Sequence, residues 1–132
     1  MKGVVVDPSA VVTIMWREPM QEGVTNLLWS AGRRLLAAPS LVELGMVLEG
    51  RRAGGAPLTE RLVRDLRLEV VPFGPETAGR ALDAFRRFGK GNHPAGLNLG
   101  DCITYALAEE QGLPILAVGD DFRRTDLPVL PA

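Results

Sequence analysis

The sequence predicts an α/β protein, an α/β/α sandwich built around a mainly parallel sheet. Short apolar runs alternate with longer helical patterns, an arrangement that favours parallel strands joined by helices. The first of these runs is continuous and β-branched, as in strands that are covered on both faces. The length of 132 residues and the hydrophobic fraction of 46% suit one domain without internal repeats, so we expect residues 1–132 to fold as a single unit.

The N-terminal part is predicted to begin with a buried strand that is followed at once by a helix. The strand is the run KGVVV at residues 2–6, and the helix covers residues 8–18, where Pro8 suits the first helical position. A second helix is expected over residues 20–31. A short strand then follows over residues 34–38.

The middle of the chain is predicted to be mainly helical. Pro39 ends the preceding strand, and residues 40–52 form a helix that is apolar nearly all round and is therefore expected to be mostly buried. A loop at residues 54–57 separates this helix from an amphipathic helix over residues 58–68. A strand over residues 69–73 comes next.

The C-terminal part is expected to alternate between helices and strands. The predicted elements are, in order, a helix with a basic end at 75–90, a turn-rich loop at 91–96, a helix within 96–112, a strand at 113–118, a loop at 119–126 and a last short strand at 127–130.

Composition and charge narrow the classes of function. The 15 basic and 16 acidic residues give a formal net charge of −1, so a nucleic-acid or membrane partner would have to use a local patch. The single cysteine, Cys102, excludes an intramolecular disulfide and a zinc site built on a cysteine pair, and we expect it in the core. The start MKGVVVDPSAVV makes a poor signal peptide and is too short to span a membrane, so we expect a cytoplasmic protein without membrane association.

Acidic side chains follow two of the predicted strands. Asp7 comes directly after the first strand, and Asp120 and Asp121 follow the strand at residues 113–118. Ligands of parallel α/β sheets bind beyond the carboxyl ends of the strands, which makes these positions candidates for a site. A purely structural role is also possible, because Asp7 can cap the helix that begins at Pro8 and aspartate is common in turns.

Two further acids lie within predicted helices. If Asn98 caps the helix that follows it, Asp101 takes the third helical position, completes a capping box and faces the positive end of the helix dipole, an effect of roughly 0.3–1 kcal/mol. Glu43 has Met46 and Val47 as helical neighbours. A lone charge on a buried helix is unfavourable unless it is paired or bound to a metal ion.

Convergence of these acids would create a metal site. Each pair of carboxylates about 5 Å apart would cost roughly 3 kcal/mol at an effective dielectric constant of about 20. Such a cluster needs protons or a divalent cation, and all-oxygen ligands suit Mg²⁺ or Mn²⁺. Ions of this kind activate water for attack on phosphorus, so the predicted chemistry is phosphodiester cleavage.

Four stretches of the sequence carry a family resemblance: VVVDPSAVV, PSLVELGMVLEGRR, FGKGNHPAGLNLGDCITYALA and AVGDDFRRTDL. In this order and spacing they resemble the PIN-domain ribonucleases, specifically the VapC-type toxins of toxin–antitoxin systems, over essentially the whole chain. The resemblance implies a PIN-like fold and an endoribonuclease that cuts single-stranded RNA, such as tRNA or rRNA, with Mg²⁺ or Mn²⁺. It also implies a homodimer that a cognate VapB-type antitoxin holds inactive.

The resemblance assigns roles to the acids. Asp7, Glu43 and Asp101 match the first, second and third acids of the family, and Asp121 matches the fourth, with Asp120 as the alternate. Asp7 and Asp101 are expected to ligate a metal ion directly. The other acids would bind a second ion or hold its water molecules.

Other positions match the family less closely or only support the acids. Ser9 and Asn98 match supporting positions. Pro8 is a departure, because the family commonly has a small or hydroxylated residue there and proline removes a backbone N–H near the site. Ile103 replaces an aromatic residue, a conservative change at a core position.

Five basic residues are candidates for contacts with RNA phosphates: Arg86, Arg87, Lys90, Arg123 and Arg124. The first three also suit a solvated helix C-terminus, where cations are favoured. The lone His93 is not expected to be catalytic, because a metal site needs no side-chain base.

The aromatic residues Trp16, Trp29, Phe85 and Phe88 are expected to fill core or interface positions rather than to stack on bases. The amphipathic helices within residues 20–68 could supply the surface for the dimer and the antitoxin.

Two alternative functions are weighed against the nuclease. A phosphotransfer protein also carries an aspartate after its first strand, but the neighbours Val6, Pro8 and Ser9 provide no second acid beside Asp7. A PIN-like module that binds RNA or a partner without cleavage is the other alternative, and the four filled acid positions favour an active nuclease over it. Neither a GxGxxG fingerprint nor a P-loop lysine motif is present.

Overall fold

A five-stranded parallel sheet forms the centre of the structure, a computed structural model that describes residues 1–132. The strand order is β3-β2-β1-β4-β5, and every pairing is parallel. The strands are β1 (Val4–Val6), β2 (Arg34–Ala37), β3 (Glu69–Val71), β4 (Ile115–Leu116) and β5 (Val129–Leu130).

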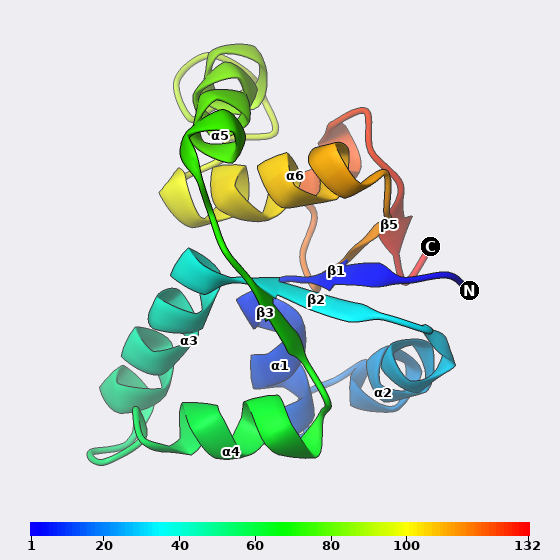
Figure 1. The fold of residues 1–132 in the computed structure, drawn as a ribbon, viewed down its shortest axis with the longest axis vertical. Coiled ribbons are helices and arrows are strands. Elements are labelled where there is room, and N and C mark those ends of the chain that lie inside the picture. The colour runs from blue at the N-terminus through cyan, green and yellow to red at the C-terminus, as the bar shows by residue number, and fades with distance from the viewer.

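Helices cover both faces of the sheet (Figure 1). One face carries α1 (Pro8–Met15), α2 (Gln21–Ser30), α3 (Ala38–Arg51) and α4 (Leu58–Asp65), and the other carries α5 (Pro75–Phe88) and α6 (Leu99–Gln111). The predicted α/β/α sandwich is confirmed, and the sheet is parallel throughout. None of the helices is long and apolar enough to cross a membrane.

The alternation of side chains along β1 divides the interior into two cores. Val4 and Val6 pack with residues of α1 to α4, whereas Val5 packs with residues of α5 and α6. All three valines are fully buried. The short β-branched run therefore works as a central strand that is covered on both faces, as its composition predicts.

The strand order places a topological switch point between β1 and β4. The chain runs from β1 outward to β2 and β3, and then returns to the other side of β1 to form β4 and β5. Asp7 follows β1 directly, and the segment 117–121 follows β4. The carboxyl ends of these two neighbouring strands form the crevice in which ligands of such sheets bind.

The prediction that the helix over residues 40–52 is mostly buried is wrong. Leu44 and Leu48 of α3 are fully buried, but Val42 is 61% exposed and Met46 is 70% exposed. The helix lies on one face of the sandwich, so its opposite side has no layer above it. It also begins at Ala38, with Pro39 inside its first turn, where proline is tolerated.

All five strands are shorter than predicted, and two of the differences are the clearest. The strand predicted at 69–73 ends at Val71, because Pro72 has no N–H to continue the ladder. The strand predicted at 113–118 is reduced to Ile115–Leu116, which matches the two-residue length of its outer neighbour β5. The predicted loop at 119–126 contains a 3₁₀ turn, η1 (Phe122–Arg124).

The aromatic residues divide between core and surface. Trp16 and Phe88 pack against the two cores, in agreement with the prediction. Trp29 and Phe85 are 46% and 41% exposed, so they do not fill the core, and an interface position stays a prediction for both. Cys102 is buried, as predicted.

Candidate active site

Asp7 lies at the junction of β1 and α1, at the centre of the sheet edge. It caps α1, with its Oδ2 accepting a hydrogen bond from the backbone N–H of Ser9 at 3.0 Å, and its Oδ1 accepts one from Thr104 Oγ at 2.9 Å. The N–H that Pro8 lacks is therefore not needed for this cap. Burial raises the pKa of Asp7, the hydrogen bonds from Ser9 and Thr104 oppose that shift, and the charge of Asp121 adds to it.

Asp101 completes the capping box predicted for α6. Its backbone N–H donates to Asn98 Oδ1 at 2.9 Å, and its Oδ2 accepts from the Asn98 N–H at 3.1 Å. Burial raises the pKa of Asp101 to about 6, against the Asn98 hydrogen bond, and the charges of Asp7 and Asp121 raise it further. The capping role and a role in the site are therefore compatible, because only one carboxylate oxygen is used by the cap.

Glu43 projects from α3 toward the first turn of α6. Its Oε1 is buried and has no hydrogen-bond partner, and no ion pair in the structure includes this residue. The carboxyl group occupies the space that a β-carbon on Gly100 would need. Burial raises the pKa of Glu43 to about 7, with the charges of Asp7 and Asp101 contributing to the shift.

A cavity of about 380 Å³ joins the four acids. Asp7, Glu43, Asp101 and Asp121 all line it. Asp120 does not line this cavity, so of the two adjacent aspartates the structure brings Asp121 to the other acids.

The donor set of the cavity fits a hard divalent cation. All four acids offer oxygen, and burial, with a smaller contribution from neighbouring carboxylate charges, raises the pKa of Asp7, Glu43 and Asp101. The buried, unpartnered Oε1 of Glu43 is a polar atom for which a cation would supply the missing partner. No group of three His, Cys, Asp or Glu side chains stands at metal-binding spacing in this structure.

Sequence reasoning missed Thr104 and two charged residues of the cavity lining, Glu18 and Arg51. Thr104 is fully buried and holds Asp7; its position three residues after Asp101, on the same side of α6, is the signal that could have found it. Arg51 lines the same cavity at the other end of α3, eight residues after Glu43. Of the predicted supporting residues, Ser9 accepts a hydrogen bond at its Oγ from the Val118 N–H at 3.1 Å and so ties α1 to the end of β4.

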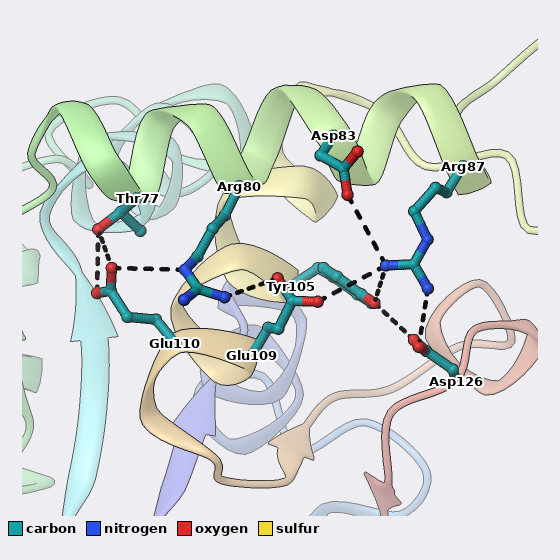
Figure 2. A network of polar contacts seen from close by, with 8 residues as sticks. All are labelled: Thr77, Arg80, Asp83, Arg87, Tyr105, Glu109, Glu110 and Asp126. Atoms are coloured by element: carbon teal, nitrogen blue, oxygen red, sulfur yellow. Dashed lines mark hydrogen bonds and ion pairs between the residues drawn. The ribbon is translucent and has the colours of Figure 1, made fainter.

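The structure does not bring the five predicted RNA-binding residues to the cavity, since none of them lines it. Figure 2 shows that Arg87 belongs to a polar network between α5, α6 and the C-terminal loop: it donates to Asp126 at 2.9 Å and to the Tyr105 hydroxyl at 3.4 Å, and it also pairs with Glu109. Its guanidinium donors are therefore used by protein acceptors.

The other four candidates differ in how they are held. Arg123 donates to the carbonyl of Pro131 at 2.6 Å, and Arg124 donates to the carbonyl of Pro94 at 3.2 Å. The remaining two, Arg86 and Lys90, are exposed on the α5 side of the molecule.

His93 has a structural environment. Its Nδ1 accepts a hydrogen bond from the Ala95 N–H at 3.0 Å, and its ring meets that of Phe88 edge-on, with centroids 5.1 Å apart.

The geometry agrees with the comparisons to known proteins. The sequence matches the family described as PIN domain over residues 4–127. Ribonuclease VapC36 of Mycobacterium tuberculosis is 42% identical over 125 residues, covering 93% of this chain and 90% of that protein. Ribonuclease VapC of Mycolicibacterium smegmatis is 39% identical, covering 93% of this chain and 96% of that protein.

Solved structures share the fold at low identity. Mycobacterium tuberculosis VapC20, a toxin that cleaves the sarcin–ricin loop, matches with a TM-score of 0.71 and 15% identity over 94% of this chain and 95% of its own. A toxin–antitoxin complex from Klebsiella pneumoniae matches with a TM-score of 0.72 and 14% identity over 98% of both chains. The chain belongs to the PIN-domain family and, within it, to the VapC ribonucleases.

Proposed function

We propose that this protein is the endoribonuclease toxin of a toxin–antitoxin pair, and that it hydrolyses phosphodiester bonds of single-stranded RNA with Mg²⁺ or Mn²⁺. The observation that carries the proposal is the cavity at the switch point, which four carboxylates line and where Glu43 Oε1 is left without a partner. None of these four acids forms an ion pair, and unpaired acids at a ligand-binding edge indicate a site for a cation rather than a structural network.

The residues that would hold the cation follow from this arrangement. Asp7 and Asp101 are proposed as direct ligands, and Glu43 and Asp121 as ligands of a second ion or of bound water. A divalent cation at this site would activate water for attack on phosphorus and stabilise the charge that develops on the leaving oxygen.

The chain's own residues keep the acids ready for this role. Thr104 and the Ser9 N–H orient the Asp7 carboxylate, while the Asn98 cap fixes Asp101 at the start of α6. Gly100 leaves space for the carboxyl group of Glu43. These contacts position oxygen donors before substrate arrives, which lowers the reorganisation needed for catalysis.

The proposed partners are a VapB-type antitoxin, an RNA such as tRNA or rRNA, and a second copy of the chain, all in the cytoplasm. The structures of similar fold include VapBC complexes from Rickettsia felis and Salmonella typhimurium, both described as bound to DNA. In this chain, Val42, Met46 and Leu99 form an exposed apolar surface beside the cavity, the kind of patch that marks a protein interface.

Cleavage of RNA by the purified protein tests the proposal. Total tRNA and rRNA would be incubated with the antitoxin-free protein and Mg²⁺, Mn²⁺ or EDTA, beside the double variant Asp7→Ala/Asp101→Ala. Discrete products that require metal and disappear in the double variant are the expected result. A folded protein that cleaves neither pool with any metal would contradict the proposal and favour a PIN-like module that binds without cleavage.

A further inference from the structure

The cavity contains a single fixed positive charge. Of the 14 residues that line it, five are acidic and one, Arg51, is basic. A polyanion that approaches four carboxylates and Glu18 is repelled until cations neutralise them. Arg51 is the one side chain of the lining that attracts a phosphate whether or not a metal ion is bound.

Arg51 occupies a defined place relative to the acids. Glu43, Val47 and Arg51 all line the cavity and follow one another at intervals of four residues, so they lie along one side of α3. Eight residues of helix correspond to about 12 Å. The backbone positions of Arg51 and Glu43 are thus separated by about two helical turns along one cavity, a spacing that suits contact with a phosphate next to the one at the acids.

The guanidinium group is held in place but keeps its donors free. It stacks on the Trp16 ring at 4.9 Å from the ring centroid, and its Nη1 lies 3.5 Å from Glu18 Oε2. The side chains of Arg51 and Glu18 are 45% and 38% exposed, so this ion pair is weak. The Arg51 guanidinium group donates no hydrogen bond to protein, whereas those of Arg87, Arg123 and Arg124 donate to protein acceptors.

We propose that Arg51, stacked on Trp16, binds an RNA phosphate next to the one that is cleaved. The inference rests on the proposed ribonuclease function and adds a substrate-binding residue to it. The planar guanidinium can give two parallel hydrogen bonds to a phosphate. Because the contact is remote from the reacting bond, it contributes to substrate binding more than to the chemical step.

Kinetics of Arg51→Gln, with Arg52→Gln as the matched control, test the inference. Arg52 is also exposed but does not line the cavity, and the Arg52→Gln variant loses the same charge as Arg51→Gln. With an RNA that the wild-type protein cleaves, Arg51→Gln should raise KM about tenfold and change kcat by less than about twofold. Arg51→Lys should recover part of the loss, since it keeps the charge without the planar fork. Equal KM values for Arg51→Gln and Arg52→Gln would overturn the inference.

Binding without cleavage separates this inference from the proposed function. In an Asp101→Asn background with EDTA, the affinity for a labelled single-stranded mixed-sequence oligoribonucleotide would be measured against salt concentration. Arg51→Gln should reduce the slope of log affinity against log salt by about 0.7, and Arg52→Gln should leave it unchanged. If wild-type protein cleaves RNA but both variants give the same slope, the inference fails alone. If no RNA is cleaved and only Arg51→Gln lowers the slope, the proposed function fails and the binding role remains.

Discussion

Two clusters of acidic side chains lie along α6, one around Asp101 in its first turn and one around Glu109 and Glu110 in its last turns, and they differ in whether the acids have basic partners. At the cavity, burial raises the pKa values of Asp101, Asp7 and Glu43, and the charges of neighbouring acids add to the shift. Toward α5, Glu109 and Glu110 pair with arginines, and Asp126 accepts hydrogen bonds from Tyr105 at 2.5 Å and from Arg87 (Figure 2).

The titration behaviour separates the two clusters. The Tyr105 hydroxyl is the main cause of a lowered pKa of Asp126, with Arg87 adding to it. Burial, followed by the hydrogen bond to Asp126, raises the pKa of Tyr105. In the network toward α5, Glu109, Glu110 and Asp126 each have an arginine partner, and the network joins α5, α6 and the C-terminal loop. Burial without an ion-pair partner, together with the charges of neighbouring acids, disfavours the ionised forms of Asp7, Glu43 and Asp101, and a bound cation would relieve this cost.

The largest expected difference in RNA cleavage is between two variants that each remove one charge, Asp101→Asn at the cavity and Asp126→Asn in the network toward α5. Asp101→Asn should lower RNA cleavage by at least about 100-fold, more than the loss expected for a supporting residue, because a proposed metal ligand is lost. Asp126→Asn should leave cleavage within about threefold of wild type but lower stability by about 1 kcal/mol, or roughly 4 °C in Tm. Cleavage rates and thermal melts of both variants measure the contrast. A wild-type rate for Asp101→Asn would remove Asp101 from the site.

A smaller loss of RNA cleavage is expected from changes at Thr104, whose contact with the acids is its hydrogen bond to Asp7. Thr104→Val removes the hydroxyl that donates to Asp7 Oδ1, so cleavage should fall about 10- to 100-fold and the Mg²⁺ concentration for half-maximal rate should rise. Thr104→Ser keeps the donor and should recover most of the rate. If valine and serine behave alike in metal titrations, the hydroxyl does not position Asp7.

Gly100 offers a way to displace Glu43 without changing its charge. A methyl group at Gly100 would overlap the Glu43 carboxyl group, which is the end of a flexible side chain and can move away. Gly100→Ala should therefore reduce cleavage about tenfold, comparable to the loss of a supporting contact, with little loss of Tm. The control is Gly79→Ala on α5, where a β-carbon meets nothing within 4 Å and activity should not change. Full activity of Gly100→Ala would show that the position of Glu43 is not needed.

The smallest effect concerns stability against pH. Because the pKa is raised to about 7 at Glu43 and to about 6 at Asp101, the folded state holds protons that the unfolded state has lost. The two carboxyl groups therefore contribute stability that is complete below their pKa values in the unfolded state, near pH 4. This stability is lost as the pH rises through their pKa values in the folded state. In EDTA, Tm should therefore fall by a few degrees between about pH 5 and about pH 7.5.

Controls can assign this pH dependence to the cavity. Glu43→Gln/Asp101→Asn should flatten it, and Mn²⁺ should restore the Tm at the higher pH. The lowered pKa of Asp126 changes stability with pH in the opposite direction. The stability that Asp126 contributes is present above its pKa in the unfolded state and is lost only as the pH falls through its pKa in the folded state. A wild-type Tm that does not change over this range would contradict the electrostatic account of the cavity.

The sequence by itself determined the order of the elements and the identity of the candidate acids. The β-branched run before Asp7 predicts a buried central strand, and Asn98 followed by Asp101 predicts the capping box, since both signals depend on residues near in sequence. The same local signals predicted Cys102 in the core. They failed for α3, where Val42 and Met46 are exposed because a helix on the outside of a sandwich has only one covered side.

Only the tertiary structure decided which charges are compensated. Arg87 looks like a phosphate-binding residue at a basic helix end, yet its partner Asp126 lies 39 residues away in sequence. Thr104 and Asp7 are 97 residues apart, and Arg51 reaches the cavity because α3 runs along it. Charge compensation and burial depend on three-dimensional neighbours, and the crossover connections of a parallel sheet bring these together from distant parts of the chain.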